Sequence, residues 1–152
     1  MSSSRALYEQ VILDHNRNPR NFGKLPEASK SVEGFNPLCG DHFTVHVKMD
    51  GDVISAITFE GSGCAISKSS ASVMTTVLKG KTRAEADDLF NHFHSMITGN
   101  PDAPIDEAAL GKLKVFSGVR EFPVRIKCAT LAWHAVHSAI AGDAETVTTE
   151  EN

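Results

Sequence analysis

A pair of alternating segments joined by a short polar turn restricts the fold of this chain more than any other feature. Apolar residues recur with a period of two through 43–49 and, apart from one serine, through 53–59, which predicts two half-buried strands. Asp50-Gly51-Asp52 lies between them and favours a tight hairpin. Such a hairpin brings the start of its first strand beside the end of its second. The predicted inward-facing residues are Phe43, Val45, Val47, Met49, Val53, Ser55, Ile57 and Phe59.

The chain has three cysteines, and the hairpin would bring two of them together. Cys39 and Asp41 precede the first strand in a bent, Pro- and Gly-containing segment, whereas Cys64 directly follows the second strand. Cys128 begins the apolar stripe of a helix predicted over 122–142. The amides and dipole near a helix N-terminus favour a thiolate over a thiol. We therefore expect three thiols and one carboxylate to converge.

Helical periodicity accounts for most of the remaining chain. It predicts a helix over 5–16, a helix from Ser67 to Gly80 with Ser67 as its cap, a helix over 82–99 with a capping box, and a short helix near 106–110. A third strand is expected near 31–35. The predicted fold is α+β, with a small antiparallel sheet of about three strands packed against helices. We expect residues 1–142 to form one domain and the acidic tail 143–152 to be disordered.

Composition excludes several classes of function. The net charge is −4 with no clustered basic surface, which argues against binding to nucleic acid. No apolar run approaches the length of a membrane span, and no signal-peptide pattern follows Met1, so we expect a cytoplasmic protein without membrane association. An odd number of cysteines then argues against a disulfide framework and leaves metal binding, nucleophilic chemistry or simple burial.

Zinc accepts three thiolates and one carboxylate in tetrahedral geometry. No C-x-x-C pair is present, so spacing alone leaves scattered buried cysteines as an alternative. Such a site carries excess negative charge, and Arg125, in the same helical turn as Cys128, is expected to offset it. The seven histidines form no metal pattern with the cysteines. A hydrolytic zinc enzyme would need an open coordination position, which four protein ligands do not leave.

Several segments together resemble the SufU branch of the IscU/NifU-like proteins, and they extend over nearly the whole chain. They are Leu7-Tyr8, Val11-Ile12-Leu13-Asp14-His15, Asn18-Pro19-Arg20-Asn21, Asn36-Pro37-Leu38-Cys39-Gly40-Asp41, Gly61-Ser62-Gly63-Cys64-Ala65-Ile66-Ser67 and Arg125-Ile126-Lys127-Cys128-Ala129-Thr130-Leu131-Ala132-Trp133. The resemblance implies the α+β fold of this family, with the site at one exposed end.

The resemblance also implies a function for the converging residues. Cys39, Asp41, Cys64 and Cys128 would bind Zn²⁺, and Cys39 would accept sulfur as a persulfide after a histidine of the donor takes its place on the metal. The donor would be a SufS-type, PLP-dependent cysteine desulfurase, and the sulfur would pass to a downstream cluster-assembly scaffold. The protein would thus be a zinc-dependent sulfurtransferase of the carrier type that serves iron-sulfur cluster assembly.

The alternative within the same family is an IscU-type scaffold, which would build an iron-sulfur cluster on the same ligands. Scaffold members carry a histidine directly before the third cysteine, where this chain has Lys127, and a Leu-Pro-Pro-Val-Lys motif that is absent here. A purely structural zinc site is a further alternative, and it predicts that Cys39→Ala unfolds the chain.

Overall fold

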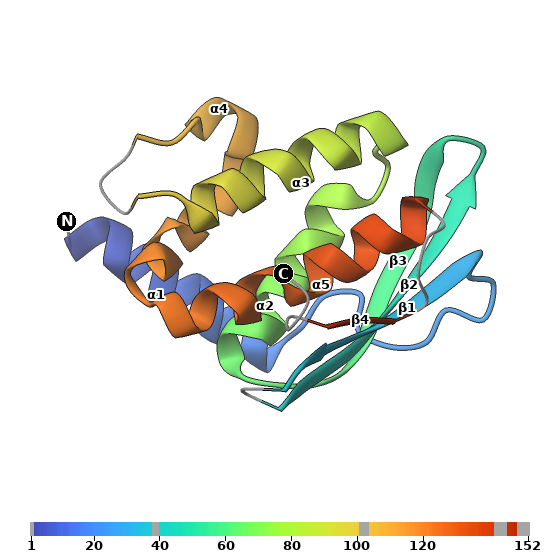
Figure 1. The fold of residues 1–152 in the computed structure, drawn as a ribbon, viewed down its shortest axis with the longest axis horizontal. Helices are drawn as coiled ribbons and strands as arrows, with labels where there is room; N and C mark the ends of the chain where they lie inside the picture. Colours follow the sequence, from blue (N-terminus) through green and yellow to red (C-terminus); the bar gives the residue numbers. More distant parts are fainter. Residues whose placement is uncertain (1, 38–39, 101–103, 142–145, 149–152) are drawn as a thin grey trace.

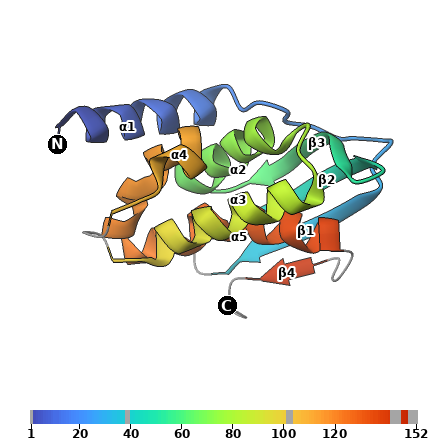
Figure 2. The same ribbon diagram turned by 90° about the horizontal axis from the view of Figure 1, so that it is seen from above.

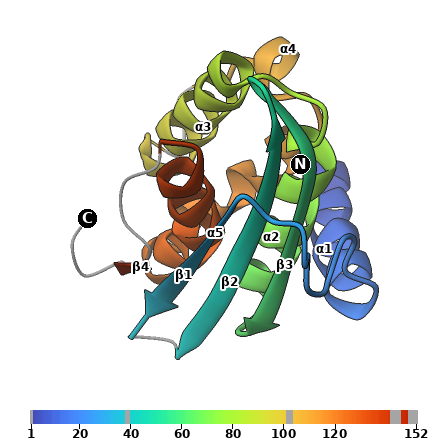
Figure 3. The same ribbon diagram turned by 90° about the vertical axis from the view of Figure 1, so that its right-hand side faces the viewer.

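The computed structural model describes residues 2–37, 40–100, 104–141 and 146–148. One sheet, of strand order β3-β2-β1-β4, has its helices on a single face (Figures 1–3). The strands are β1 (Lys30–Asn36), β2 (Asp41–Asp50), β3 (Val53–Ser62) and β4 (Thr146–Thr148). The helices are α1 (Ser2–Arg17), α2 (Ala65–Leu78), α3 (Arg83–Thr98), α4 (Glu107–Leu110), the 3₁₀ helix η1 (Gly111–Glu121) and α5 (Pro123–Ala141).

The hairpin of β2 and β3 is present, but its second strand buries a different set of residues from the predicted one. On β2, Phe43, Val45 and Val47 are buried as expected, while Met49 is partly exposed. On β3 the buried residues are Ile54, Ile57 and Phe59; Val53 and Ser55, which we expected to face inward, are partly exposed.

A bulge causes this difference. Lys48 pairs with Ala56, whereas Met49 pairs with Ile54, so Ser55 is the extra residue. The Ser55 hydroxyl donates a hydrogen bond to the Lys48 carbonyl at 3.1 Å. An extra residue reverses the alternation of the strand on one side of it, which moves Ile54 onto the inner face.

The first and last of the predicted helices, and the third strand, form close to their expected positions. The predicted capping box of α3 is confirmed, because the Thr82 hydroxyl accepts the Glu85 N–H at 3.1 Å and the Glu85 carboxylate accepts the Thr82 N–H at 2.9 Å. The predicted start of α2 is wrong: the helix begins at Ala65 with Cys64, not Ser67, as its N-cap.

The 3₁₀ helix η1 was not predicted from the sequence. Three of its four buried residues, Leu113, Phe116 and Val119, recur every third position, which is the period of a 3₁₀ helix. Phe116 meets Phe93 of α3 edge to face, at 6.1 Å between ring centroids. Phe93 in turn stacks on Trp133 of α5 at 4.6 Å, so η1, α3 and α5 share one aromatic core.

The short strand β4 gives the sheet a fourth member that the sequence did not predict. It pairs with β1 in parallel, with Gly34 opposite Val147, whereas β1 to β3 pair in antiparallel fashion. β4 lies within the tail 143–152 that we expected to be disordered. The domain boundary at residue 142 stays a prediction, and residues 142–145 and 149–152 lie outside the described residues. Across the described parts of the chain, no helix combines the length and apolar character that crossing a membrane requires.

A histidine lies in the contact between α3 and α5. The His134 ring meets the edge of Phe90 at 5.5 Å and lies 5.6 Å from the His94 ring. Burial, and then the charges of His94 and His137, lower the pKa of His134 to about 4. The folded protein therefore holds His134 neutral at a pH where the unfolded chain protonates it.

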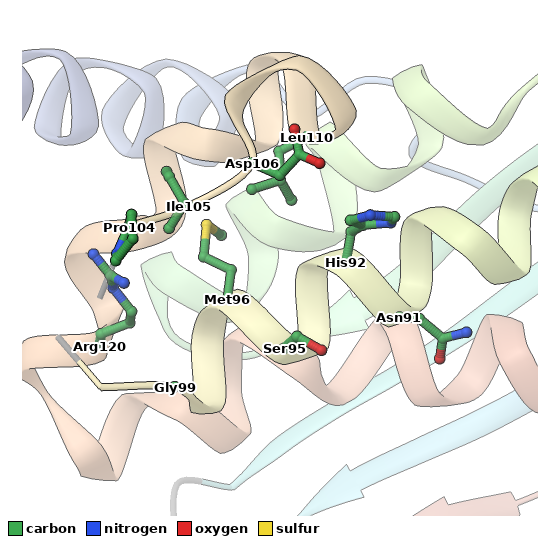
Figure 4. Close-up of a pocket in the computed structure, with 10 residues that line it drawn as sticks. All are labelled: Asn91, His92, Ser95, Met96, Gly99, Pro104, Ile105, Asp106, Leu110 and Arg120. Atoms are coloured by element: carbon green, nitrogen blue, oxygen red, sulfur yellow. The ribbon is translucent and has the colours of Figure 1, made fainter. Parts of the chain in front are cut away.

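We expect this histidine to make the fold sensitive to acid. Because the pKa is lower in the folded state, its stabilising effect is complete above pH 6.5 and is lost as the pH falls toward 4. For a partly exposed side chain this amounts to about 1 kcal/mol between pH 7 and pH 5. Urea unfolding at pH 7 and at pH 5 measures the effect: the free energy of unfolding should decrease less between the two for His134→Phe than for the natural protein. The control His92→Phe replaces a partly exposed histidine of α3 that lines the cavity of Figure 4, and it should show the same decrease in stability as the natural protein. Equal decreases in all three proteins would contradict the prediction.

Candidate metal centre

The hairpin brings the start of β2 beside the end of β3, as its topology predicts. His42 pairs with Ser62, which places Asp41 next to the segment that leaves β3. Asp41 is 1% exposed, and its Oδ1 accepts the backbone N–H of Cys64 at 2.8 Å. The carboxylate therefore fixes the position of the cysteine backbone as well as offering a ligand atom.

Cys64 lies at the N-terminus of α2, where its sulfur acts as the cap. The Ser67 N–H points at Cys64 Sγ across 3.5 Å, and the Ser67 hydroxyl donates to the Cys64 carbonyl at 3.0 Å. The pKa of Cys64 is lowered to about 5, first by hydrogen bonding with Cys128 and then by Ser67, against the opposing effect of burial. A thiol with this pKa is largely thiolate at neutral pH, the form that binds metals.

Cys128 projects from the second turn of α5 and is fully buried. The next residue, Ala129, accepts a hydrogen bond through its carbonyl from the Ser70 hydroxyl of α2 at 2.6 Å. This bond joins the two helices that carry Cys64 and Cys128. Nothing in the sequence singles out Ser70, because it is one of four buried serines on α2.

The ligand atoms of Asp41, Cys64 and Cys128 all lie within 4.8 Å of one another, and within the described residues this is the group of metal-binding side chains that converges. Donor atoms of a tetrahedral zinc site with bonds of about 2.0–2.3 Å lie about 3.3–3.8 Å apart. A contraction of about 1 Å would thus bring the three into coordination distance. Two soft thiols with one carboxylate suit zinc, so the residues present fit this metal.

Cys39 lies outside the described residues, so its membership of this set stays a prediction. The residues on either side of the undescribed pair are in place. Gly40 has φ of +72°, a conformation that glycine adopts without strain, and its N–H donates to the Asn36 carbonyl at 2.8 Å. The segment that holds Cys39 therefore starts and ends beside Asp41.

Two glycines, Gly61 near the end of β3 and Gly63 directly after it, allow the close approach of the hairpin ends. A Cβ on Gly63 would lie 2.6 Å from Asp41 Oδ1 and 2.7 Å from Ser67 Oγ, both closer than real Cβ contacts. Gly61 has φ of +129°, and a Cβ there would collide with the His42 carbonyl. The sequence indicated only that these glycines end a strand; the structure shows that they make room for the site.

Arg125 is exposed on the first turn of α5 and acts electrostatically on Tyr8 of α1. Burial raises the pKa of Tyr8, the positive charge of Arg125 opposes this rise, and the negative charge of Cys64 adds to it. Tyr8 thus lies within electrostatic range of both residues, although the sequence did not mark it as part of the site. The predicted role of Arg125 in offsetting the charge of the metal centre stays a prediction.

A separate cavity of about 270 Å³ lies between α3, the segment leading into α4, and the end of η1 (Figure 4). Met96, Ile105 and Leu110 line it, with Arg120 at one end. The Arg120 guanidinium donates to the Asn100 carbonyl at 3.1 Å. None of the converging metal-binding residues lines this cavity.

Comparison with known proteins places the chain in a family. Residues 7–129 match the profile of the NifU-like N terminal domain. The chain is 46% identical over 136 residues to the zinc-dependent sulfurtransferase SufU of Bacillus subtilis, covering 89% of this chain and 90% of that protein. It is 41% identical over 140 residues to the iron-sulfur cluster assembly scaffold protein IscU of Streptococcus pyogenes, and the match covers 92% of this chain and 86% of that protein.

The fold agrees with this relationship. A crystal structure of a putative iron-sulfur cluster assembly scaffold protein for the SUF system, from Fervidobacterium islandicum, superposes with a TM-score of 0.82 at 36% identity, covering 89% of this chain and 97% of that one. The crystal structure of the N-terminal part of a NifU-like protein from Brucella abortus superposes with a TM-score of 0.79 at 27% identity, covering 89% of this chain and 92% of that one. This chain therefore belongs to the NifU-like N-terminal domain family, in its SufU branch.

Proposed function

We propose that this protein is a zinc-dependent sulfurtransferase of the carrier type, which accepts sulfur from a cysteine desulfurase for iron-sulfur cluster assembly. The observation that carries the proposal is the convergence of Asp41, Cys64 and Cys128 at the open end of the β2–β3 hairpin. Cys39, two positions before Asp41 in the sequence, is the fourth ligand of the proposal and lies outside the described residues. The relationship to a protein named a zinc-dependent sulfurtransferase supports the metal and the activity. The proposal places the protein in the cytoplasm, where thiols stay reduced.

Each residue of the site has a separate task in this proposal. Zinc, when bound, keeps cysteine ligands in the thiolate form without a separate base. Asp41, Cys64 and Cys128 would hold the metal, and Cys39 would be the residue that accepts the sulfur. Asp41, the hardest donor of the four, would be the weakest ligand and would keep the centre labile enough for Cys39 to be exchanged. Arg125, exposed at the start of α5, supplies positive charge near the thiolates.

The sulfur transfer itself is a thiol–disulfide type of exchange. The Cys39 thiolate attacks the outer sulfur of the persulfide on a SufS-type, PLP-dependent desulfurase. A new S–S bond forms on Cys39, the S–S bond of the donor breaks, and the donor cysteine leaves with the electron pair as a thiolate. No external oxidant or reductant is consumed, and the persulfide on Cys39 is then available to a downstream scaffold.

A desulfurase assay tests this proposal. The purified protein should contain zinc by elemental analysis and should stimulate sulfide release when added to a cysteine desulfurase with cysteine. Cys39→Ala should fold normally and abolish both the stimulation and the mass increase of one sulfur on this protein. Ser62→Ala, at the exposed end of β3, should retain both. A Cys39→Ala protein that unfolds would instead indicate a structural zinc site.

An IscU-type scaffold is the second candidate, because several relatives carry that name. It would hold an iron-sulfur cluster on the same four residues. Stable binding of iron and sulfide without zinc, and no Cys39-dependent stimulation of the desulfurase, would favour the scaffold over the sulfur carrier.

A further inference from the structure

A buried asparagine touches two of the converging residues. Asn36 is the last residue of β1, is 1% exposed, and pairs directly with Asp41 of β2. Its side-chain Nδ2 lies 3.4 Å from Asp41 Oδ2 and 3.4 Å from Cys128 Sγ. Asn36 opens the segment that carries Cys39 in the sequence, but no pattern indicated its contact with Cys128, which is 92 positions away.

The two contacts fit an amide nitrogen and no other polar group of similar size. An NH₂ group has two hydrogens to donate, and a carboxylate and a thiolate are both acceptors. With the amide turned over, its oxygen would face two groups that carry negative charge in a metal centre. The distance of 3.4 Å is long for an N–H···O bond but ordinary for a bond to the larger sulfur atom, so the stronger contact is to Cys128.

The backbone of Asn36 has a separate role. Its carbonyl accepts the Gly40 N–H at 2.8 Å and so closes the segment 36–40. Any side chain at this position keeps that bond, because it is made by the main chain. Substitution of the side chain therefore changes the amide contacts while the closure of the segment remains.

From these contacts we infer that Asn36 is a positioning residue of the metal centre, whose neutral amide orients Cys128 and Asp41 and spreads part of their negative charge. This inference rests on the proposed zinc site. Three thiolates and a carboxylate outweigh the charge of Zn²⁺ by two, and Arg125 is exposed to solvent, so a buried donor is the more effective compensation. Hydrogen bonds to metal ligands from the surrounding shell typically change metal affinity about 10- to 100-fold.

Two substitutions at Asn36 test the inference. Asn36→Ala removes the donor, and Asn36→Asp replaces it with an acceptor of the same shape and adds a negative charge. We expect the zinc dissociation constant, measured by competition with a chromophoric chelator, to rise by about 10- to 100-fold for Asn36→Ala and further for Asn36→Asp. The control is Asn91→Asp, which adds the same charge at an exposed position on α3 and should bind zinc as the natural protein does.

A spectroscopic measurement separates positioning from a general loss of stability. In protein loaded with Co²⁺, the thiolate-to-metal charge-transfer band should move to longer wavelength in Asn36→Ala, because a hydrogen bond to sulfur lowers the energy of its lone pairs. The unfolding midpoint of each metal-free variant shows whether it folds. Should Asn36→Asp fail to fold, Asn36→Ala alone decides the test.

The outcomes distinguish this inference from the proposed function. Tight zinc binding by the natural protein, together with an unchanged dissociation constant and an unchanged Co²⁺ spectrum in Asn36→Ala, overturns the role of Asn36 and leaves the proposed function standing. Failure of the natural protein to bind zinc overturns both. Weakened binding with a shifted band supports the inference.

Discussion

Serine in place of Cys128 is expected to weaken zinc binding by more than about 100-fold, above the range seen for changes outside the ligand set. Serine matches cysteine closely in shape, but its hydroxyl does not ionise at neutral pH and is a poor zinc ligand. Cys128 is fully buried, so no water-exposed side chain can readily replace it. The metal-free fold should change little, because one buried sulfur is exchanged for a buried oxygen beside the Asn36 amide.

Zinc content and unfolding midpoints with and without a chelator measure this effect. A ligand that binds only the folded state raises its stability, so the chelator should lower the midpoint of the natural protein and not that of Cys128→Ser. Thr130→Ser, two residues along α5, removes a methyl group from another buried side chain and should keep the response to chelator. A Cys128→Ser protein that still holds one zinc per chain with the natural affinity would exclude Cys128 as a ligand.

Alanine at Gly63 should disrupt the site directly, because the added carbon would meet two of its side chains. Its Cβ would lie 2.6–2.7 Å from Asp41 Oδ1, the Phe43 ring and Ser67 Oγ. Overpacking costs about 1–3 kcal/mol, and displacing Asp41 weakens its bond to the Cys64 N–H, for a total of about 2–4 kcal/mol. Zinc affinity should fall as well, since Asp41 and Cys64 move apart.

The matched control is Gly118→Ala. Its Cβ would meet the Tyr8 ring at 3.5–3.6 Å, which is ordinary van der Waals contact, and Gly118 has no positive φ. Urea unfolding should therefore place Gly118→Ala within about 1 kcal/mol of the natural protein. If Gly63→Ala were equally stable and bound zinc normally, the close approach of the hairpin ends would not be required for the site.

The approach of Asp41 to Cys64 could be predicted from the sequence, because a period of two and a tight turn determine which ends of a hairpin meet. The bulge at Ser55 could not be predicted in the same way. A bulge depends on how the two backbones pair, and the residues on either side of it are compatible with an unbroken strand. The alternation therefore gave the right inner face for β2 and the wrong one for the start of β3.

Features that depend on tertiary contact were also missed. Ser67 looked like the better cap by residue type, but the Cys64 sulfur occupies that place because Asp41 holds its backbone. Asn36 showed no sign of its contact with Cys128, which only the packing of α5 on the sheet creates. Pairing of β4 with β1 was hidden for the same reason, since three residues are too few for a recognisable pattern.

The distribution of the donors along the chain has a consequence for biosynthesis. Residues 41, 64 and 128 come from the first third, the middle and the last helix, so the N-terminal part of a nascent chain carries an incomplete set of ligands. These three ligand side chains come together only after α5 has been synthesised and has packed against β1 and β2. Metal capture would then report completed folding, and a truncated chain that ends before α5 would lack a high-affinity centre with which to sequester the ion.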